Sequence, residues 1–512
     1  MIHHKSFALP RDLRGWGSVL ACAVAVLALA WAIPVRFFIS HGQPLWLDET
    51  WTGAIAAQPS FAAVVRQAWL DVNAPLYYGV MHLWAQAFGV SNAALRLPSA
   101  LFGAAAPLLI VFARGTGLAL PLRLTWAALL ALWTQGIYLS GEARGYTLLL
   151  LLCTASALAY MRLVAAPTLG RAAIWCGLSA LAVLTHYHAL ILAGLQGLAY
   201  LAWRRQAALR TWPAALLFLP AFAWLAVHLP RIAEFMRPGV AWYPILNERR
   251  LERALAFPLG PPSMLPWLGG VLAVGVVVAA GTLWMIRRGR RARAQDSLAA
   301  WATFGLALVG AAAILAMGFV RPSFTDRYLV PFTPALLLGL TLLAGRIGRG
   351  TSLLLIPVAV VFAWAAVPFA DTQVREGWRW YNWEVASRDL MRGRPERLVF
   401  VWDHPASPVL ARDQLEMIGG FFFRRAGAPV EVLPLVLDAR SNPNPRVAEA
   451  LRAPRAALIW AYDRGVIGTA ARRFAPRLDS LDPSLICRNY GSGSIGVLAC
   501  DRVGSVKTTA KP

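Results

Sequence analysis

The feature that most constrains this 512-residue chain is the recurrence of apolar runs of eighteen or more residues between Gly15 and Ala370. A helix of about 20 such residues crosses a hydrocarbon core about 30 Å thick. Charged residues make up 14% of the chain, whereas soluble domains carry roughly 25%. The chain is therefore expected to be an α-helical, polytopic membrane protein. We predict eleven spans, near 17–39, 95–113, 124–139, 146–164, 172–186, 188–203, 212–230, 264–286, 298–319, 328–345 and 351–369.

The basic residues predict the orientation. They gather at the N-terminus and on every second connection, most densely in the run RRGRRAR at 287–293. Short loops rich in Arg and Lys stay in the cytoplasm. The N-terminus is then cytoplasmic, and residues after about Asp371 lie outside a bacterial inner membrane. The net charge of +24 reflects this topology, so we expect no nucleic-acid partner.

Residues 40–94 form a long connection on the outer face. Proline and other helix-breaking residues divide this segment into short pieces. Two pieces, about 60–70 and 76–88, have the amphipathic pattern of helices that lie in the membrane interface. We therefore assign residues 1–370, with the outer loop 40–94, to a transmembrane domain.

Residues 371–512 have a different composition and predict a small extracytoplasmic α/β domain. Three apolar runs, 397–403, 430–437 and 456–463, are typical of buried strands separated by helix-length segments. Residues 485–500 predict a terminal hairpin, and a turn at Gly493–Ser494 would place Cys487 opposite Cys500. Facing cysteines outside the membrane can form a disulfide. The alternative is two free buried thiols.

The connections assigned to the outer face also hold most of the ionisable residues of the membrane part. Ionisable groups at membrane level are costly and mark functional sites. Those that we single out are Asp48, Glu49, Asp71, Glu142, Arg144, His186, His188, Glu234, Arg321, Asp326 and Arg327.

Asp48 and Glu49 directly follow the first span. A partly buried carboxylate at the mouth of a membrane cavity can accept the proton of an attacking hydroxyl, because burial raises its pKa. The alternative is an acidic pair that complements a helix N-terminus. Asp71 begins the string DVNAPLYY and would position the acceptor or the first carboxylate, unless it is a simple helix cap.

Glu142, Arg144 and Tyr146 lie between the third and fourth spans. The planar guanidinium of an arginine can bind phosphate with two parallel hydrogen bonds. Arg144 is therefore a candidate for a departing phosphate, and an ion pair with Glu142 is a compatible structural role.

The strings LDE (47–49), DVNAPLYY (71–78), ALRLPSALFG (94–103) and EARGY (142–146) occur in this order. Together they resemble the dolichyl/polyprenyl-phosphate-mannose–protein mannosyltransferase superfamily. This superfamily has the C-type glycosyltransferase fold and includes protein O-mannosyltransferases and lipid A aminoarabinose transferases. The later string DRYLVP (326–331) is similar to an element of bacterial members.

The resemblance implies inverting transfer from a polyprenyl-phosphate sugar. In that case Asp48 matches the presumed base and Asp71 the second acidic motif, while Arg144 and Arg327 match positions for the carrier phosphate. Asn73 and Ala74 replace a His and a Pro of many protein mannosyltransferases, which weighs against a protein acceptor. The acceptor stays open among lipid, polysaccharide and protein.

His186 and His188 have three interpretations: metal ligands, hydrogen-bonding groups near the donor, or a polar turn. Residues i and i+2 do not face each other on a helix, so only a turn would let both bind a metal. The alternative, by analogy with related oligosaccharyltransferases, is that Asp48 and Asp71 share a divalent cation, but no dense ligand set accompanies them. We expect no metal and no other cofactor.

Two other classes of function fit a polytopic chain. A transporter or flippase of lipid-linked sugars predicts inverted repeats and ionisable residues at mid-depth. A non-catalytic membrane scaffold predicts that Asp48 is dispensable. Charges gathered at one edge favour the enzyme. Loop 231–263, with Glu234, Arg237, Trp242 and Tyr243, would help shape the acceptor site.

Overall fold

The computed structural model describes residues 13–237, 245–261, 295–321, 323–347, 352–376, 383–402, 409–436, 449, 455–461, 485–489 and 496–502. The predicted span 264–286, the basic run 287–293, the loop residues Trp242 and Tyr243 and the turn Gly493–Ser494 lie outside the described residues.

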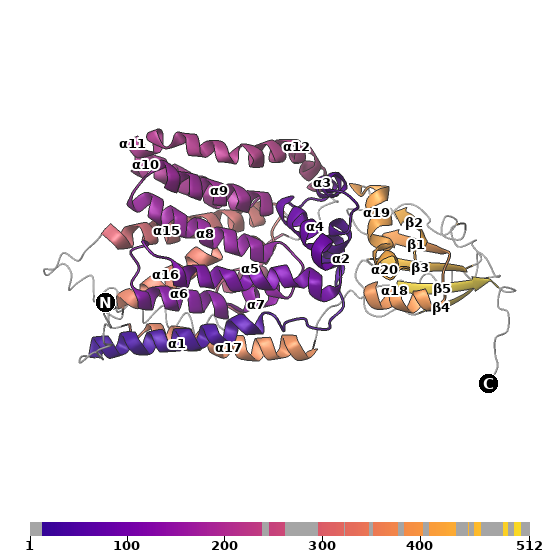
Figure 1. Ribbon diagram of the computed structural model, residues 1–512, viewed down its shortest axis with the longest axis horizontal. Coiled ribbons are helices and arrows are strands. Elements are labelled where there is room, and N and C mark those ends of the chain that lie inside the picture. Colours follow the sequence, from indigo (N-terminus) through magenta and orange to yellow (C-terminus); the bar gives the residue numbers. More distant parts are fainter. Residues whose placement is uncertain are drawn as a thin grey trace, which may run out of the picture. The chain divides into compact units, whose positions relative to one another are not determined.

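The apolar runs form helices, as predicted (Figure 1). Within the described part of the chain, six helical segments are long and apolar enough to cross a membrane. They include α1 (Leu13–Val35), α5 (Asn92–Phe112), α8 (Tyr146–Ala165), η1 with α12 (Trp212–Phe218 and Leu219–Phe235), α15 (Gln295–Val320) and α17 (Leu355–Glu376).

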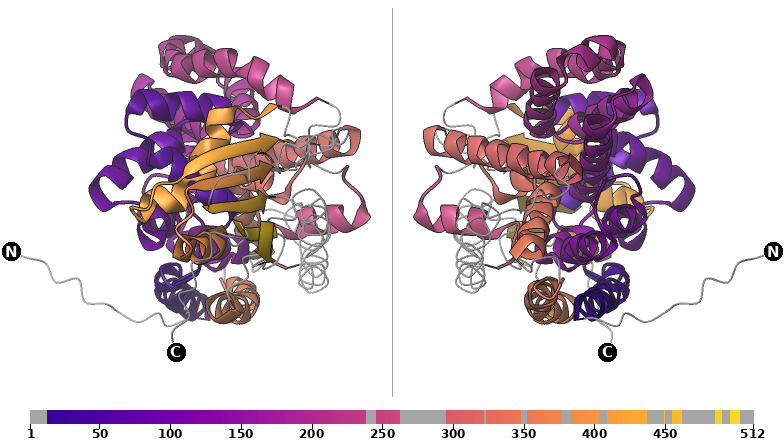
Figure 2. Two further views of the ribbon diagram at one scale, coloured as in Figure 1. Left: turned by 90° about the vertical axis from the view of Figure 1, so that its right-hand side faces the viewer. Right: turned by 90° about the vertical axis from the view of Figure 1, so that its left-hand side faces the viewer.

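Four further predicted spans coincide with shorter apolar helices: α6 (Leu120–Leu132), α9 (Leu169–Thr185), α10 (Ala189–Trp203) and α16 (Thr333–Ile347). The remaining elements of this part are α7 (Thr134–Ser140), α11 (Arg205–Arg210), α13 (Glu248–Ala256) and η3 (Asp326–Leu329). Helices α1 and α17 pack together and lie side by side in both end views (Figure 2).

The predicted span 124–139 is interrupted at Trp133, where α6 ends and α7 begins. A helix end leaves backbone carbonyls without intrahelical partners, and these need donors in a membrane. The buried guanidinium of Arg36 supplies them: it donates to Leu130 O at 3.2 Å, to Ala131 O at 2.6 Å and to Gly136 O at 2.5 Å. Arg36 therefore stabilises the interruption.

The outer connection 40–94 forms α2 (Leu47–Ala56), α3 (Phe61–Leu70) and α4 (Leu76–Phe88), which pack on one another. Helices α3 and α4 coincide with the two predicted amphipathic pieces. Ser60 caps α3, because its hydroxyl accepts from Ala63 N at 3.2 Å.

The C-terminal region is an α/β structure with a five-stranded sheet in the order β2-β1-β3-β5-β4. Strand β1 is parallel to β2 and β3, whereas β5 is antiparallel to β3 and β4. The elements are α18 (Trp383–Arg392), β1 (Arg397–Trp402), α19 (Arg412–Gly419), α20 (Phe421–Arg425), β2 (Glu431–Val436), β3 (Arg455–Ala461), β4 (Leu485–Asn489) and β5 (Gly496–Arg502). The three predicted strands and the hairpin strands are confirmed, and Cys487 is the register partner of Cys500. The disulfide itself stays a prediction.

The backbone divides into two compact units. Unit 1 comprises residues 1–41, 96–226 and 243–376, and unit 2 comprises residues 42–95, 227–242 and 377–512. This division differs from the boundary predicted near residue 370. The physical reason is that α2 packs against α19 and α20, so the outer connection 42–95 groups with the α/β region.

Candidate active site

The candidate site residues fall into two sets. Asp48, Glu49 and Asp71 belong to unit 2, and the other candidates, Glu142, Arg144, Tyr146, His186, His188 and Arg327, belong to unit 1. Each set is described within its own unit.

In unit 2, the two carboxylates of the LDE string have different environments. Both lie in the first turn of α2. Glu49 is fully buried, and its Oε2 accepts from the backbone N–H of Trp46 at 3.1 Å, so it caps the helix. Asp48 is partly exposed, and its backbone carbonyl accepts from the Thr52 hydroxyl at 3.2 Å. Of the two residues, only Asp48 is accessible to solvent.

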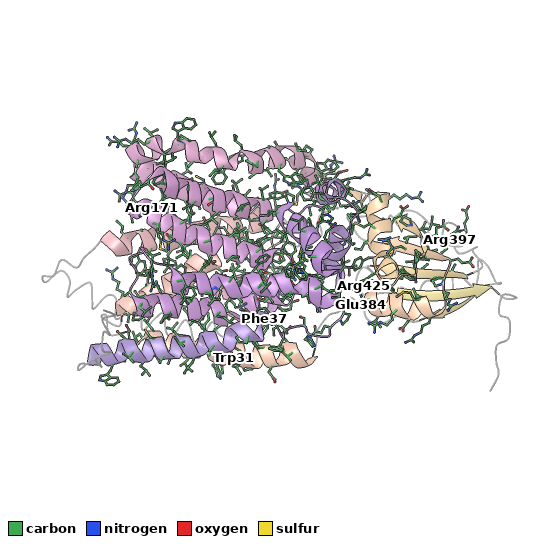
Figure 3. All side chains as sticks on the ribbon, in the orientation of Figure 1. Trp31, Phe37, Arg171, Glu384, Arg397 and Arg425 are labelled. Atoms are coloured by element: carbon green, nitrogen blue, oxygen red, sulfur yellow. The ribbon has the colours of Figure 1, made fainter. Side chains whose placement is uncertain are left out.

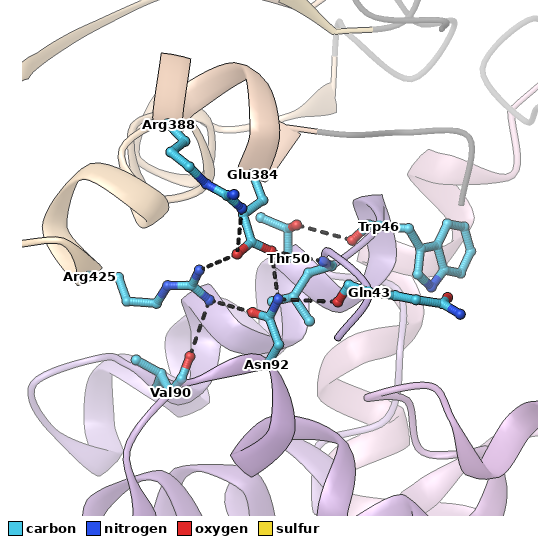
Figure 4. A network of polar contacts seen from close by, with 9 residues as sticks. Gln43, Trp46, Thr50, Val90, Asn92, Glu384, Arg388 and Arg425 are labelled. Carbon is cyan, nitrogen blue, oxygen red and sulfur yellow. Dashed lines mark hydrogen bonds and ion pairs between the residues drawn. The ribbon is translucent and has the colours of Figure 1, made fainter. Parts of the chain in front are cut away.

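A polar network holds the chain that enters α2 (Figure 4). The Glu384 carboxylate accepts from Leu45 N at 3.0 Å, from Asn92 Nδ2 at 2.7 Å and from Arg425 Nη2 at 2.8 Å. Arg425 also donates to Asn92 Oδ1 at 2.7 Å. A charged side chain of α18 thus tethers the segment that begins only three residues before Asp48.

Asp71 is the C-cap residue of α3, and its carboxylate is bonded within its own loop. Oδ1 accepts from Val72 N at 2.8 Å, while Oδ2 accepts from Asn73 Nδ2 at 3.0 Å and from the Tyr78 hydroxyl. His228 Nε2 contacts the Asp71 carbonyl at 2.6 Å. These bonds hold the DVNAPLYY loop in shape, and Asn73 thereby gains a structural role.

In unit 1, segments that are far apart in the sequence meet. Tyr328 stacks on His188 with ring centroids 4.0 Å apart and lies 5.2 Å from His186. Tyr146 lies 6.0 Å from His186, and the Arg327 guanidinium lies 5.3 Å from the centre of the Tyr146 ring. Tyr146, the turn 186–188 and residues 327–328 therefore lie close together.

Glu142 is the buried carboxylate of this cluster. Its side chain is fully buried, and its Oε1 forms an ion pair with Arg327 Nη2 at 3.6 Å. Neither carboxylate oxygen has a hydrogen-bond partner among the residues that the structure describes. A buried carboxylate without hydrogen bonds is costly, which is typical of a group that meets a ligand.

The ALRLPSALFG string forms part of α5 and supports the turn that carries Arg144. The Ser99 hydroxyl donates to the Arg144 carbonyl at 3.2 Å, and the Arg144 side chain is largely buried. A Cβ at Gly103 would lie 2.3 Å from the Ser140 Oγ. Ser99 thus links this string to the EARGY string, and Gly103 allows α5 to approach Ser140 at the end of α7.

Both histidines are neutral at pH 7. Burial lowers the pKa of His186 well below its ordinary value, and the charges of His188 and Arg144 lower it further. Burial lowers the pKa of His188 to about 4. The His188 backbone N–H points at His186 Nδ1 at 3.4 Å, and Trp224 donates to the Tyr187 hydroxyl at 2.9 Å. These contacts indicate an aromatic wall, in which His186 and His188 serve as uncharged rings.

Asp326 lies at the start of η3, beside Arg327. Burial raises the pKa of Asp326, and the charges of Arg253, Arg250 and Arg327 oppose this shift. Across the described residues, no three His, Cys, Asp or Glu side chains are grouped so that they could hold a metal ion. The arrangement in unit 1 suits an anionic ligand beside aromatic rings.

Sequence reasoning missed several residues that shape these clusters. Arg36 and His228 could have been found, because an ionisable residue within or beside an apolar run indicates a buried polar contact. Glu384 had no such signal, because its hydrogen-bond partners lie 41 to 339 positions away in the sequence.

Comparison with known proteins supports the fold. No protein-family model matches the chain, and no curated protein sequence matches it. ArnT from Cupriavidus metallidurans in the apo state has a TM-score of 0.55 at 14% identity, covering 97% of this chain and 99% of that chain. ArnT bound to undecaprenyl phosphate has a TM-score of 0.54 at the same identity and coverage.

An oligosaccharyltransferase from Archaeoglobus fulgidus has a TM-score of 0.46 at 12% identity, covering 93% of this chain and 72% of that chain. The match to ArnT extends along nearly the full length of both chains. The chain therefore has the C-type glycosyltransferase fold that its sequence motifs predicted.

Proposed function

We propose that this chain is an inverting glycosyltransferase. It moves a sugar from a polyprenyl-phosphate carrier to a hydroxyl group of an envelope acceptor, on the outer face of a bacterial inner membrane. The observation that carries the proposal is the cluster of unit 1. There the guanidinium of Arg327 lies beside the buried carboxylate of Glu142 and the ring of Tyr146, with neutral histidines nearby.

The charges of this cluster suit a phosphodiester. Arg144 and Arg327 supply two guanidinium groups, and His186 and His188 are neutral, so the cluster favours an anionic ligand. A sugar linked to a polyprenyl monophosphate carries one negative charge. A neutral aromatic wall also suits the apolar face of a sugar ring. The structural likeness to an ArnT that binds undecaprenyl phosphate supports this class of donor.

In the proposed reaction, the acceptor hydroxyl attacks the anomeric carbon of the donor. The Asp48 carboxylate takes the hydroxyl proton as the new C–O bond forms. The bond from the anomeric carbon to the phosphate oxygen breaks, and its electron pair leaves with the polyprenyl phosphate. Arg144 and Arg327 stabilise that charge, and Asp71 keeps its loop in shape.

The test is transfer by the purified full-length chain in nanodiscs, with radiolabelled polyprenyl-phosphate sugars and an envelope extract as the acceptor source. Asp48→Asn should lower kcat by about 10²–10⁴-fold, because loss of a general base costs this much. Arg144→Gln should weaken inhibition by free polyprenyl phosphate, which reports binding without chemistry. Asp389→Asn, in an exposed pair with Arg392 of α18, is the matched control and should transfer at the wild-type rate.

Transfer by Asp48→Asn at the wild-type rate would remove Asp48 as the base. Movement of the donor across the vesicle membrane without transfer to any acceptor would favour a flippase. Absence of both activities with every donor would favour a scaffold.

A further inference from the structure

An apolar pocket lies in unit 1, away from the candidate active site. It has a volume of about 360 Å³ and is formed by α9, α10, η1 and α12. Trp175, Phe218 and Phe222 contribute rings to its lining. At Gly194 of α10 an added Cβ would meet no atom within 4 Å, so this wall borders open space. The pocket can take a hydrocarbon chain.

A second pocket, of about 640 Å³, adjoins the first. It is lined by Arg204, Arg205 and Arg210 at α11, and by Leu169 at the start of α9. Thr211 lines both pockets. An apolar pocket therefore opens beside a basic one.

The basic pocket has an excess of positive charge. Residues 143–233 contain no Asp or Glu. None of the ion pairs between described residues involves the three arginines of this pocket. Arg204 Nε donates to the Val164 carbonyl at 3.1 Å and so serves the end of α8. Arg205 and Arg210 are exposed and remain for an anionic ligand.

This pocket is distinct from the proposed donor site. It lies at the N-terminal end of α9, whereas His186 caps the opposite end. The helix has 17 residues, so the two ends are about 26 Å apart. Figure 3 places Arg171 at the α11 end of unit 1. Under the positive-inside rule this end is cytoplasmic, where anionic lipids are available.

We propose that the paired pockets bind one anionic glycerophospholipid. An acyl chain occupies the apolar pocket, and the phosphate of the headgroup binds Arg205 and Arg210. Basic pockets between transmembrane helices on the cytoplasmic side bind anionic headgroups in this manner. Only an amphiphile satisfies both pockets at once. The site stabilises the packing of α9 to α12 and does not depend on the proposed transfer reaction.

The test is native mass spectrometry of the delipidated full-length chain in detergent. It is mixed with equal amounts of phosphatidylglycerol and phosphatidylcholine that have the same acyl chains. The wild type should retain phosphatidylglycerol over phosphatidylcholine by about 10-fold or more. Phosphatidylglycerol has a net negative charge that the two arginines attract, whereas the ammonium group of phosphatidylcholine cancels the charge of its phosphate. Arg205→Gln/Arg210→Gln should bring this ratio close to one, and Arg205→Lys/Arg210→Lys should restore most of it.

Two further variants separate headgroup from chain. Arg249→Gln/Arg253→Gln removes the same charge from exposed positions of α13 and should leave the ratio unchanged. Gly194→Leu fills the apolar pocket and should lower retention of both lipids. Equal retention by the wild type, or a preference that survives Arg205→Gln/Arg210→Gln, would overturn the proposal. Displacement of the lipid by millimolar inorganic phosphate would also overturn it, because the pockets would then be an anion site alone. Displacement by polyprenyl phosphate would overturn it too, because the pockets would then belong to the donor.

Discussion

The network around Glu384 allows a quantitative prediction. Glu384→Ala removes an acceptor that is nine-tenths buried and that serves Leu45 N, Asn92 and Arg425 (Figure 4). Removing one partner of a buried ion pair costs about 3–5 kcal/mol. The Arg425 side chain is 22% exposed and Arg388 is 61% exposed, so water compensates part of this loss. Leu45 is fully buried, and its backbone N–H loses the Glu384 acceptor. We therefore expect a loss of about 3 kcal/mol in the stability of unit 2.

The assay is thermal inactivation in detergent, combined with limited proteolysis of residues 377–512. The control is Glu416→Ala, since Glu416 is 41% exposed and pairs with an Arg412 that is 73% exposed. Exposed pairs contribute at most about 1 kcal/mol. A double substitution, Glu384→Ala/Arg425→Leu, should recover part of the loss, because the guanidinium left without a carboxylate is then only that of the exposed Arg388.

Catalysis provides a second measurement on Glu384→Ala. The Leu45 bond holds the entry to α2, so at a temperature where the variant stays folded kcat should fall more than the donor KM rises. The reasoning is refuted if Glu384→Ala is no less stable than Glu416→Ala, or if the double substitution is additive.

Three further predictions concern unit 1. Arg36→Met should destabilise the chain by about 3 kcal/mol or more, because three backbone carbonyls and the Ser140 hydroxyl each lose the hydrogen bond that Arg36 donates. A thermal midpoint within one degree of wild type would contradict this. Gly103→Ala should cost about 1–3 kcal/mol through contact with Ser140, and Ser140→Gly in the same chain should relieve most of the clash; the thermal midpoints of both variants test this. Burial lowers the pKa of His188 to about 4 in the folded chain, whereas the pKa of a histidine in the unfolded chain is about 6.5. As the pH falls, the unfolded chain therefore takes up this proton before the folded chain does. The contribution of His188 to the free energy of unfolding is complete above about pH 6.5 and is lost as the pH falls toward 4. His188→Phe keeps the stack on Tyr328 and should make this dependence shallower, with the contribution of His186 remaining; inactivation midpoints between pH 7.5 and 4.5 measure it.

Much of the secondary structure could be predicted because it depends on local pattern. The spans follow from apolar length, and the strands 397–402 and 455–461 follow from short apolar runs of β-branched and aromatic residues. The register of Cys487 with Cys500 followed from the symmetry of a hairpin about its turn. The interruption at Trp133 could not be predicted, because it depends on Arg36, nearly 100 residues earlier.

The candidate site was predictable only in part. The motifs identified Glu142, Arg144 and Arg327 as separate members, and the distribution of basic residues over the connections predicted a common face for them. The sequence suggested that Glu142 pairs with Arg144. In the structure the ion pair of Glu142 is with Arg327, 185 positions later, at 3.6 Å. Local spacing cannot predict such a pair, because it depends on how η3 packs against its neighbours.

The sequence by itself determined that this chain spans a membrane, where most of its described membrane helices lie, and which residue types are available at one face. These properties follow from hydropathy and from local hydrogen bonding, which act over a few residues. The tertiary structure decided that Glu49 caps a helix while Asp48 stays accessible, and that Asp71 is bonded within its own loop. It also decided that the outer connection 42–95 groups with the α/β region. The physical reason is that burial and partner choice depend on side chains brought together by packing, and these are distant along the chain.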